Sequence, residues 1–180
     1  VGYYFAKYLH QHLDIPIGII NSSYGGSRIE TWMSKEMLGY DEQDISLGEN
    51  NFNQATVAYN TMLHPLIHTP IKGVIWYQGE SNMGNRETAL SYTNQLKTLI
   101  SSWRELWGLE ELPFIWVQLP NIGTEANEST PGTWDALPML RAAMSRTLSL
   151  PHTGEITAID LGEIDIHPME KEPVGKRLSL

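Results

Sequence analysis

Hydrophobic and polar positions follow two patterns along the chain, one typical of amphipathic helices and one of buried strands. Helical spacing of apolar residues begins at Val1 with no capping residue ahead of it, so we expect the chain to start inside a helix whose upstream part is missing. Apolar positions with a period near 3.6 predict further helices at 55–66, 87–106, 137–148 and 172–180. Short apolar runs bounded by glycine, proline or polar residues predict strands at 17–20, 73–77, 113–119 and 156–161.

Strands and helices follow one another with short connections, which predicts an α/β fold. Continuous apolar strands are typical of a parallel sheet covered on both faces, so we expect a three-layer sandwich with a mostly parallel sheet. A chain of 180 residues fits a single domain spanning 1–180, because a chain of this size buries roughly 70% of the surface that its unfolded form exposes. Ligands of such sheets bind beyond the carboxyl ends of the strands.

Composition and charge exclude several classes of protein. With 41% hydrophobic and 18% charged residues, the chain is neither disordered nor fibrous. Its formal net charge of -9, without a Lys/Arg cluster, argues against a nucleic-acid partner and favours a neutral or weakly charged small substrate. No apolar run approaches the roughly 18 residues of a membrane-spanning helix. The absence of cysteine excludes a thiol nucleophile and a thiolate metal site.

Three of the predicted strands end in segments rich in polar side chains. These segments are 21–27, 78–82 and 160–168. Because the carboxyl ends of parallel strands meet at one edge of a sheet, we expect the three segments to lie close together. Their side chains predict an esterase site at that edge.

His167 is the strongest catalytic candidate, because it follows a strand and Pro168 fixes the turn after it. A neutral imidazole held by a carboxylate can take a proton from a serine hydroxyl, so we interpret His167 as a general base. A lone histidine after a strand is also a common structural hydrogen-bonding residue. Asp165 could orient the ring, although residues two apart on an extended chain point to opposite sides. Asp160 and Glu163 are the alternatives.

Gly25 and Gly26 allow the backbone to approach a ligand closely, and their N–H groups could stabilise an oxyanion. A tight turn that requires positive φ is the more common use of two adjacent glycines. Gln78 could donate its side-chain amide to the same oxyanion, and Glu80 could orient a neighbouring group. Polar side chains at a strand end can also serve only to cap a loop.

Ser81 is the candidate nucleophile within this chain. Gly79-Glu-Ser-Asn-Met-Gly84 partly resembles the Gly-x-Ser-x-Gly nucleophile elbow, with its final glycine one residue late. A serine in this place can equally cap the helix that follows.

Histidines and tryptophans elsewhere in the chain suggest a metal ion and a sugar as possible ligands. His64 and His68 have the spacing of metal ligands on one helix face, but Pro65 occupies the position at which a zinc-protease helix carries its glutamate. We therefore expect no metal there. Most of the six tryptophans are expected in the core, and three could line a sugar site: Trp32, Trp76 and Trp134.

Taken together, these residues resemble the sialate O-acetylesterase family, a branch of the SGNH hydrolase superfamily. The resemblance runs almost end to end through five segments: 15–34, 59–66, 71–82, 114–120 and 160–168. Among their motifs are Asn21-Ser-Ser-Tyr-Gly-Gly26, Trp76-Tyr-Gln-Gly-Glu-Ser-Asn82 and Asp165-Ile-His-Pro168. Five segments in the same order are far more specific than any one of them.

This resemblance implies a flavodoxin-like SGNH hydrolase fold and a serine esterase that needs no metal or other cofactor. Its substrate would be an acetylated sugar, typically sialic acid acetylated at the 9-position, and its location secreted or periplasmic. By position, His167 would be the base and Asp165 its orienting acid. Gly25 or Gly26 would form the oxyanion hole together with Gln78.

The chain departs from the family pattern in two features. Family members carry their nucleophile in a Gly-Gln-Ser-Asn-Met segment on the first strand, and this chain contains no such segment. SGNH enzymes usually place an aspartate three residues before the histidine, where this chain has Ile164. We therefore expect an N-terminally incomplete esterase domain that lacks its first strand. The sheet edge left open would invite pairing with the missing segment or with a second copy of the chain.

Two rival interpretations remain. The chain could be a self-contained small serine hydrolase that uses Ser81. It could also be a noncatalytic carbohydrate-binding domain that keeps the aromatic residues and has lost the chemistry.

Overall fold

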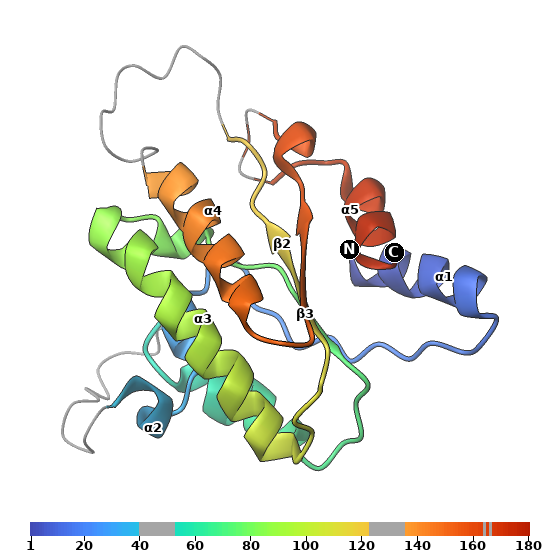
Figure 1. Cartoon of the computed structure of the whole chain (residues 1–180), viewed down its shortest axis with the longest axis horizontal. Coiled ribbons are helices and arrows are strands. Elements are labelled where there is room, and N and C mark those ends of the chain that lie inside the picture. The colour runs from blue at the N-terminus through green and yellow to red at the C-terminus, as the bar shows by residue number, and fades with distance from the viewer. Residues whose placement is uncertain (40–52, 123–135, 164, 166) are drawn as a thin grey trace.

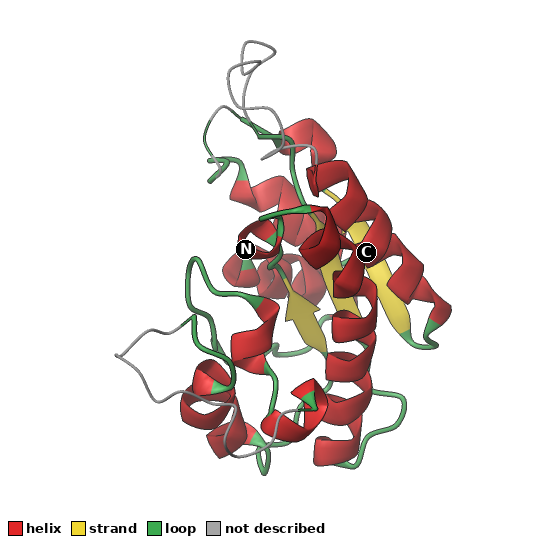
Figure 2. Ribbon diagram, turned by 90° about the vertical axis from the view of Figure 1, so that its left-hand side faces the viewer, coloured by secondary structure: helices red, strands yellow, loops and turns green. Residues whose placement is uncertain are grey.

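Three parallel strands form the centre of the fold, and helices pack around them (Figures 1 and 2). The computed structural model describes residues 1–39, 53–122, 136–163, 165 and 167–180. Its strands are β1 (Val74–Trp76), β2 (Phe114–Gln118) and β3 (Thr153–Thr157), paired in that order. Both pairings are parallel, with Trp76 opposite Trp116 and Trp116 opposite Glu155. The predicted α/β class with a parallel sheet is confirmed.

Helices cover both faces of the sheet. They are α1 (Gly2–Leu13), α2 (Lys35–Leu38), α3 (Arg86–Trp107), α4 (Ala136–Arg146) and α5 (Lys171–Leu178). The pair α3 and α4 lies on one side of the strands, and the pair α1 and α5 on the other (Figure 1). Parallel strands need a crossover between them, which α3 supplies between β1 and β2 and α4 between β2 and β3.

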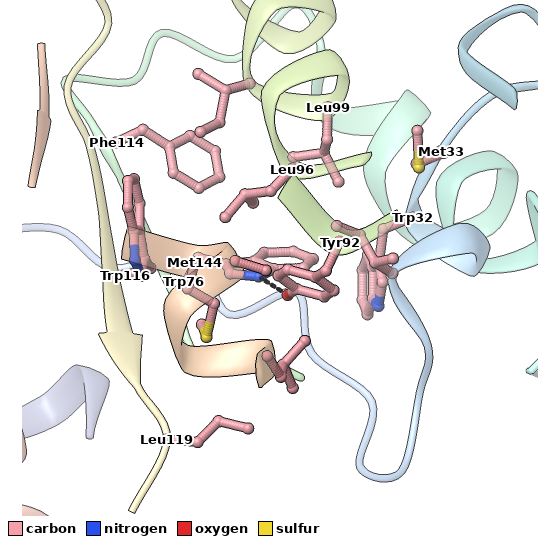
Figure 3. Close-up of a cluster of buried hydrophobic side chains, with 14 of the residues drawn as sticks. Trp32, Met33, Trp76, Tyr92, Leu96, Leu99, Phe114, Trp116, Leu119 and Met144 are labelled. Atoms are coloured by element: carbon pink, nitrogen blue, oxygen red, sulfur yellow. Dashed lines mark hydrogen bonds between the residues drawn. The ribbon is translucent and has the colours of Figure 1, made fainter. Parts of the chain in front are cut away.

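Alternate residues of the strands face different layers, as the two-residue period of a strand requires. On the α3 and α4 side, Trp76, Phe114 and Trp116 pack into the larger core (Figure 3). On the other side, Val117 packs against Val174 and Leu178 of α5, so that this face forms a second, smaller core. The three layers that the apolar strands predict are therefore present.

The longest helix, α3, begins and ends where its sequence dictates. The side chain of Asn85 accepts a hydrogen bond from the Thr88 N–H at 2.9 Å, and the Thr88 hydroxyl oxygen accepts one from the Asn85 N–H at 3.2 Å. This reciprocal cap satisfies N–H groups that the first turn would otherwise leave unpaired. Gly108 ends the helix at φ 64°, the left-handed conformation that favours glycine.

The predicted buried strand at 17–20 is wrong. Ile19 and Ile20 are 44% and 48% exposed, and the segment pairs with no strand among the described residues. A buried strand needs neighbours for its N–H and C=O groups, but this segment lines a cavity instead.

Other element boundaries differ from the prediction for local reasons. The helix predicted at 55–66 is instead a short π-helical turn, Tyr59–Leu63, followed by a 3₁₀ turn, His64–Leu66. Pro65 has no N–H to donate, and this prevents a regular helix. The last strand lies earlier than predicted, because β3 ends at Thr157 and Ile159–Leu161 forms a 3₁₀ turn.

Candidate active site

A cavity of about 1650 Å³ lies between residues 15–27, strand β1 and the neighbouring helices. Six of the predicted site residues line it: Gly25, Gly26, Gln78, Glu80, Ser81 and His167. They come from three separate parts of the chain, which the parallel sheet brings to one edge. The cavity is larger than a usual small-molecule pocket of roughly 300–1,000 Å³, because it also extends along β1.

Asp165 and His167 contact each other in an exposed turn. The Asp165 Oδ1 lies 3.1 Å from the His167 Nδ1 and also accepts the His167 backbone N–H at 2.7 Å. These hydrogen bonds lower the pKa of Asp165, the backbone one most strongly. The two side chains do not point to opposite sides as on an extended strand, because Asp165 and His167 each lie in a bend of the chain.

The two alternative carboxylates are engaged elsewhere. Asp160 forms an ion pair with Arg177, whose Nη1 lies 2.6 Å from the Asp160 Oδ1. Glu163 accepts the backbone N–H of Met169 at 2.7 Å. Of the three candidates, Asp165 is the one that contacts the imidazole. Ile164, where the family pattern expects an aspartate, lies outside the described residues.

The turn after β1 depends on Gly79. Its φ of 154° lies outside the range of most side chains, and a Cβ there would lie 3.0 Å from the Leu119 Cδ1. The chain then forms the 3₁₀ turn Glu80–Asn82. As a result Gln78 and Asn82 point into the protein, and Ser81 lies at the cavity.

Both N–H groups of the Gln78 amide are engaged. The Nε2 donates to the Ser27 carbonyl oxygen at 2.9 Å and to the Asn82 Oδ1 at 2.8 Å. An amide nitrogen carries two hydrogens, so none is left for a substrate oxygen in this arrangement. Gln78 could stabilise an oxyanion only after it releases Ser27.

The Ser81 hydroxyl donates to the Gly26 carbonyl oxygen at 2.8 Å. No hydrogen bond joins it to His167, and both residues are among those described. A nucleophilic serine needs a base as the acceptor of its proton. In this structure Ser81 instead connects the turn after β1 to the Gly25–Gly26 turn, where Gly26 has φ 72°.

Glu80 lies largely buried at the cavity, and its environment changes its ionisation. Burial raises the pKa of Glu80, because the carboxylate loses hydration, while its own backbone N–H and the charges of His167 and Lys171 partly oppose the rise. A carboxyl group with a raised pKa beside a histidine is typical of a functional site.

Trp32 and Trp76, considered for a sugar site, and His64, considered for a metal site, pack against other aromatic side chains. Trp32 and Trp76 line the cavity but are only 3% and 7% exposed, and their rings meet edge to face with centroids 6.3 Å apart. Trp134 lies outside the described residues. His64 packs against the Tyr59 ring, and the described residues contain no group of three or more side chains placed to bind a metal ion.

No helix in the described ranges is long and apolar enough to cross a membrane.

The sequence prediction missed three residues that support the site. Glu30, Asn82 and Tyr92 form hydrogen bonds with one another or with Gln78. Asn82 could have been found, since it belongs to the same polar segment as Gln78 and Glu80. The contacts of Glu30 and Tyr92 arise from tertiary packing and leave no local signal in the sequence.

We predict that Glu80→Gln stabilises the protein at neutral pH. A carboxyl group whose pKa is raised by folding contributes full stability below its ordinary pKa, and this contribution is lost as the pH rises through the raised pKa. The neutral glutamine avoids that loss. Urea unfolding followed by tryptophan fluorescence should give a higher free energy of unfolding for the variant at neutral pH, with a smaller difference at mildly acidic pH. The exposed Glu110 provides a control, since Glu110→Gln should behave like wild type; a destabilised Glu80→Gln would contradict this account.

Comparison with known proteins identifies relatives. A family model described as carbohydrate esterase, sialic acid-specific acetylesterase matches residues 1–174. Human sialate O-acetylesterase is 34% identical over 206 residues, which cover all of this chain and 38% of the human protein. The mouse protein of the same name is 30% identical over 230 residues, and here the chain covers 41% of the relative. The chain thus spans less than half the length of these relatives.

Two solved structures are also similar to this chain. A carbohydrate acetylesterase from Xanthomonas citri is 44% identical, with a TM-score of 0.85, over 99% of this chain and 39% of that one. A protein from Arabidopsis thaliana with 22% identity and a TM-score of 0.66 covers 97% of this chain and 64% of that one, and shares the fold. The chain therefore belongs to the carbohydrate esterase family of sialic acid-specific acetylesterases.

Proposed function

We propose that this chain is the histidine-bearing part of a carbohydrate O-acetylesterase, which hydrolyses acetyl esters on sugar hydroxyls. The observation that carries the proposal is the Asp165–His167 pair, whose histidine lines the same cavity as the Gly25–Gly26 turn. The names of the relatives support it, since they are called sialate O-acetylesterase or carbohydrate acetylesterase. The substrate would be an acetylated sialic acid or a related glycan.

The proposed reaction uses a serine hydroxyl and the imidazole of His167. With Asp165 at Nδ1, the Nε2 takes the serine proton while the serine oxygen bonds to the acetyl carbon. Backbone N–H groups of Gly25 or Gly26 stabilise the oxyanion, and Gln78 joins them if it releases Ser27. His167 then returns the proton to the departing sugar oxygen. Water then gives a proton to His167 as its oxygen bonds to the carbonyl carbon of the acetyl-serine. The bond from that carbon to the serine oxygen breaks, His167 returns the proton to the serine, and acetate is released.

The proposal includes a serine from a segment outside these 180 residues. Ser81 does not fit the role, because its hydroxyl donates to the Gly26 carbonyl. Strand β1 pairs with β2 on one edge, and no described strand pairs with its other edge. The cavity runs beside β1 and is bounded across from it by residues 15–27. A further parallel strand placed there would end next to the Glu80–Asn82 turn and could present a serine to His167.

We predict that this chain alone is not labelled by a fluorophosphonate serine probe. Labelling requires a serine activated by a base, and Ser81 has no such contact. Intact mass should show no adduct on the chain alone and one adduct after a serine-bearing upstream segment from a relative is joined to it. An adduct on Ser81 would establish the rival self-contained hydrolase. No adduct in either protein would favour the noncatalytic carbohydrate-binding domain.

We also predict that His167→Ala removes most of the acetate release by the serine-bearing form. Loss of a general base usually costs about 10²–10⁴-fold in rate. The measurement is acetate release from an O-acetylated sialic acid, with His12→Ala as control because His12 lies exposed on α1. Retention of activity in His167→Ala would exclude His167 as the base. Sugar binding without acetate release by the unsubstituted serine-bearing form would favour the noncatalytic carbohydrate-binding domain.

A further inference from the structure

A chain of buried polar side chains connects the core to the candidate site. The Trp76 Nε1–H donates to the Tyr92 oxygen at 3.1 Å, and the Tyr92 hydroxyl donates to the Gln78 Oε1 at 2.7 Å (Figure 3 shows the first of these bonds). The Gln78 Nε2 donates to the Asn82 Oδ1 at 2.8 Å, and the Asn82 Nδ2 donates to the Glu30 Oε2 at 2.9 Å. All four hydrogen bonds point the same way, toward the Glu30 carboxylate.

Glu30 accepts from a second amide. The Gln95 Nε2 donates to its Oε1 at 2.7 Å, while the Gln95 Oε1 is buried without a partner among the described residues. The Gln95 amide thus satisfies the carboxylate and leaves its own carbonyl unpaired. No ion pair joins Glu30 to a basic side chain in the described part of the chain. The two amides are its side-chain donors.

An ionised carboxylate can only accept hydrogen bonds, so it dictates which way an amide beside it is turned. With Glu30 ionised, Asn82 must present its Nδ2 to Glu30 and its Oδ1 to Gln78. Gln78 must then present its Nε2 to Asn82 and its Oε1 to Tyr92. If Asn82 flipped, its Nδ2 would face the Gln78 Nε2, and if Gln78 flipped, its Oε1 would face the Asn82 Oδ1. Either mismatch would be costly in a site where Asn82 is 2% and Tyr92 0% exposed.

The oriented amides hold the backbone of the cavity wall. The second N–H of Gln78 donates to the Ser27 carbonyl oxygen at 2.9 Å, and the Asn82 Oδ1 also accepts the Ile29 N–H at 3.0 Å. Together with the bond from Ser81 to Gly26, these contacts fix the segment that follows the Gly25–Gly26 turn. The orientation set at Glu30 therefore reaches the residues proposed to stabilise the oxyanion.

We propose that Glu30 is a positioning residue of the esterase site, acting through Asn82 and Gln78 on the Gly25–Ser27 turn. Its effect on hydrolysis rests on the proposed function, while its effect on the two amides does not. In Glu30→Gln, the new amide can donate as well as accept, so it no longer dictates the orientation of Asn82. The Ile29 N–H and the Ser27 carbonyl then hold the two amides without the carboxylate, so we expect Gln78 to release Ser27 more often.

Hydrogen exchange of the side-chain amides tests the proposal on the chain as it is. In wild type, nuclear magnetic resonance should show a single, slowly exchanging set of side-chain N–H signals for Gln78 and for Asn82. In Glu30→Gln, these signals should exchange at least about tenfold faster, the equivalent of one lost buried hydrogen bond. The matched control is Glu87→Gln, which removes an exposed carboxylate from the first turn of α3 and should leave both sets unchanged.

Two results would overturn the proposal. One is wild-type exchange that is already fast at Gln78 and Asn82, which decides the matter even if the variant does not fold. The other is a folded Glu30→Gln whose two amides behave as in wild type.

The kinetics of hydrolysis by the serine-bearing form then distinguish a positioning role of Glu30 from a purely structural one. Positioning predicts that Glu30→Gln lowers kcat with little change in KM, and that Glu30→Asp, which keeps the charge, retains more of kcat. Unchanged kcat in a variant with disturbed amides would overturn the positioning role. If the unsubstituted serine-bearing form shows no hydrolysis, while Glu30→Gln still speeds exchange at the Gln78 and Asn82 amides, the proposed function fails. The orienting effect of Glu30 then stands.

Discussion

Much of the structure depends on the hydrogen bonds that the turn after β1 must make inside the protein. Gln78 and Asn82 are almost fully buried, and a buried amide without partners is costly. Their partners come from Ser27 and Ile29, from Tyr92 of α3 and from Glu30. The turn can therefore satisfy its own polar groups only by tying β1, α3 and the segment 26–30 together.

This constraint explains why the candidate site forms where it does. Gly79 turns the chain at the carboxyl end of β1, Ser81 reaches the Gly26 carbonyl, and Glu80 remains at the cavity. His167 reaches the same cavity from beyond β3, on a turn that Asp165 holds through two hydrogen bonds. The first part of the site is held by hydrogen bonds of the buried Gln78 and Asn82 amides, whereas the His167 segment is exposed and rests on local contacts with Asp165.

The fold class, and the placement of six candidate residues at one cavity, follow from local signals in the sequence. The apolar runs around Trp76 and Trp116 predict buried parallel strands, and the 3.6-residue period of 87–106 predicts the helix α3. The run at Ile19 and Ile20 has the same apolar pattern, but a strand also needs a paired neighbour, which no local pattern reveals. The engagement of both Gln78 N–H groups, and the role of Glu30, depend on contacts between residues far apart in the chain. Asp165 lies within hydrogen-bonding distance of the His167 ring, although an extended strand would point the two side chains to opposite sides.

The central claim is that the site is completed by a serine-bearing strand along the open edge of β1. The Val74 N–H donates to the Pro113 carbonyl on the β2 side, so the N–H of the next residue, Ile75, points to the open edge. The most direct test is backbone amide exchange at Ile75, measured for this chain alone and after a serine-bearing upstream segment is joined to it. We expect fast exchange in the chain alone and strong protection in the joined form. Equal exchange at Ile75 in the two proteins would contradict the claim.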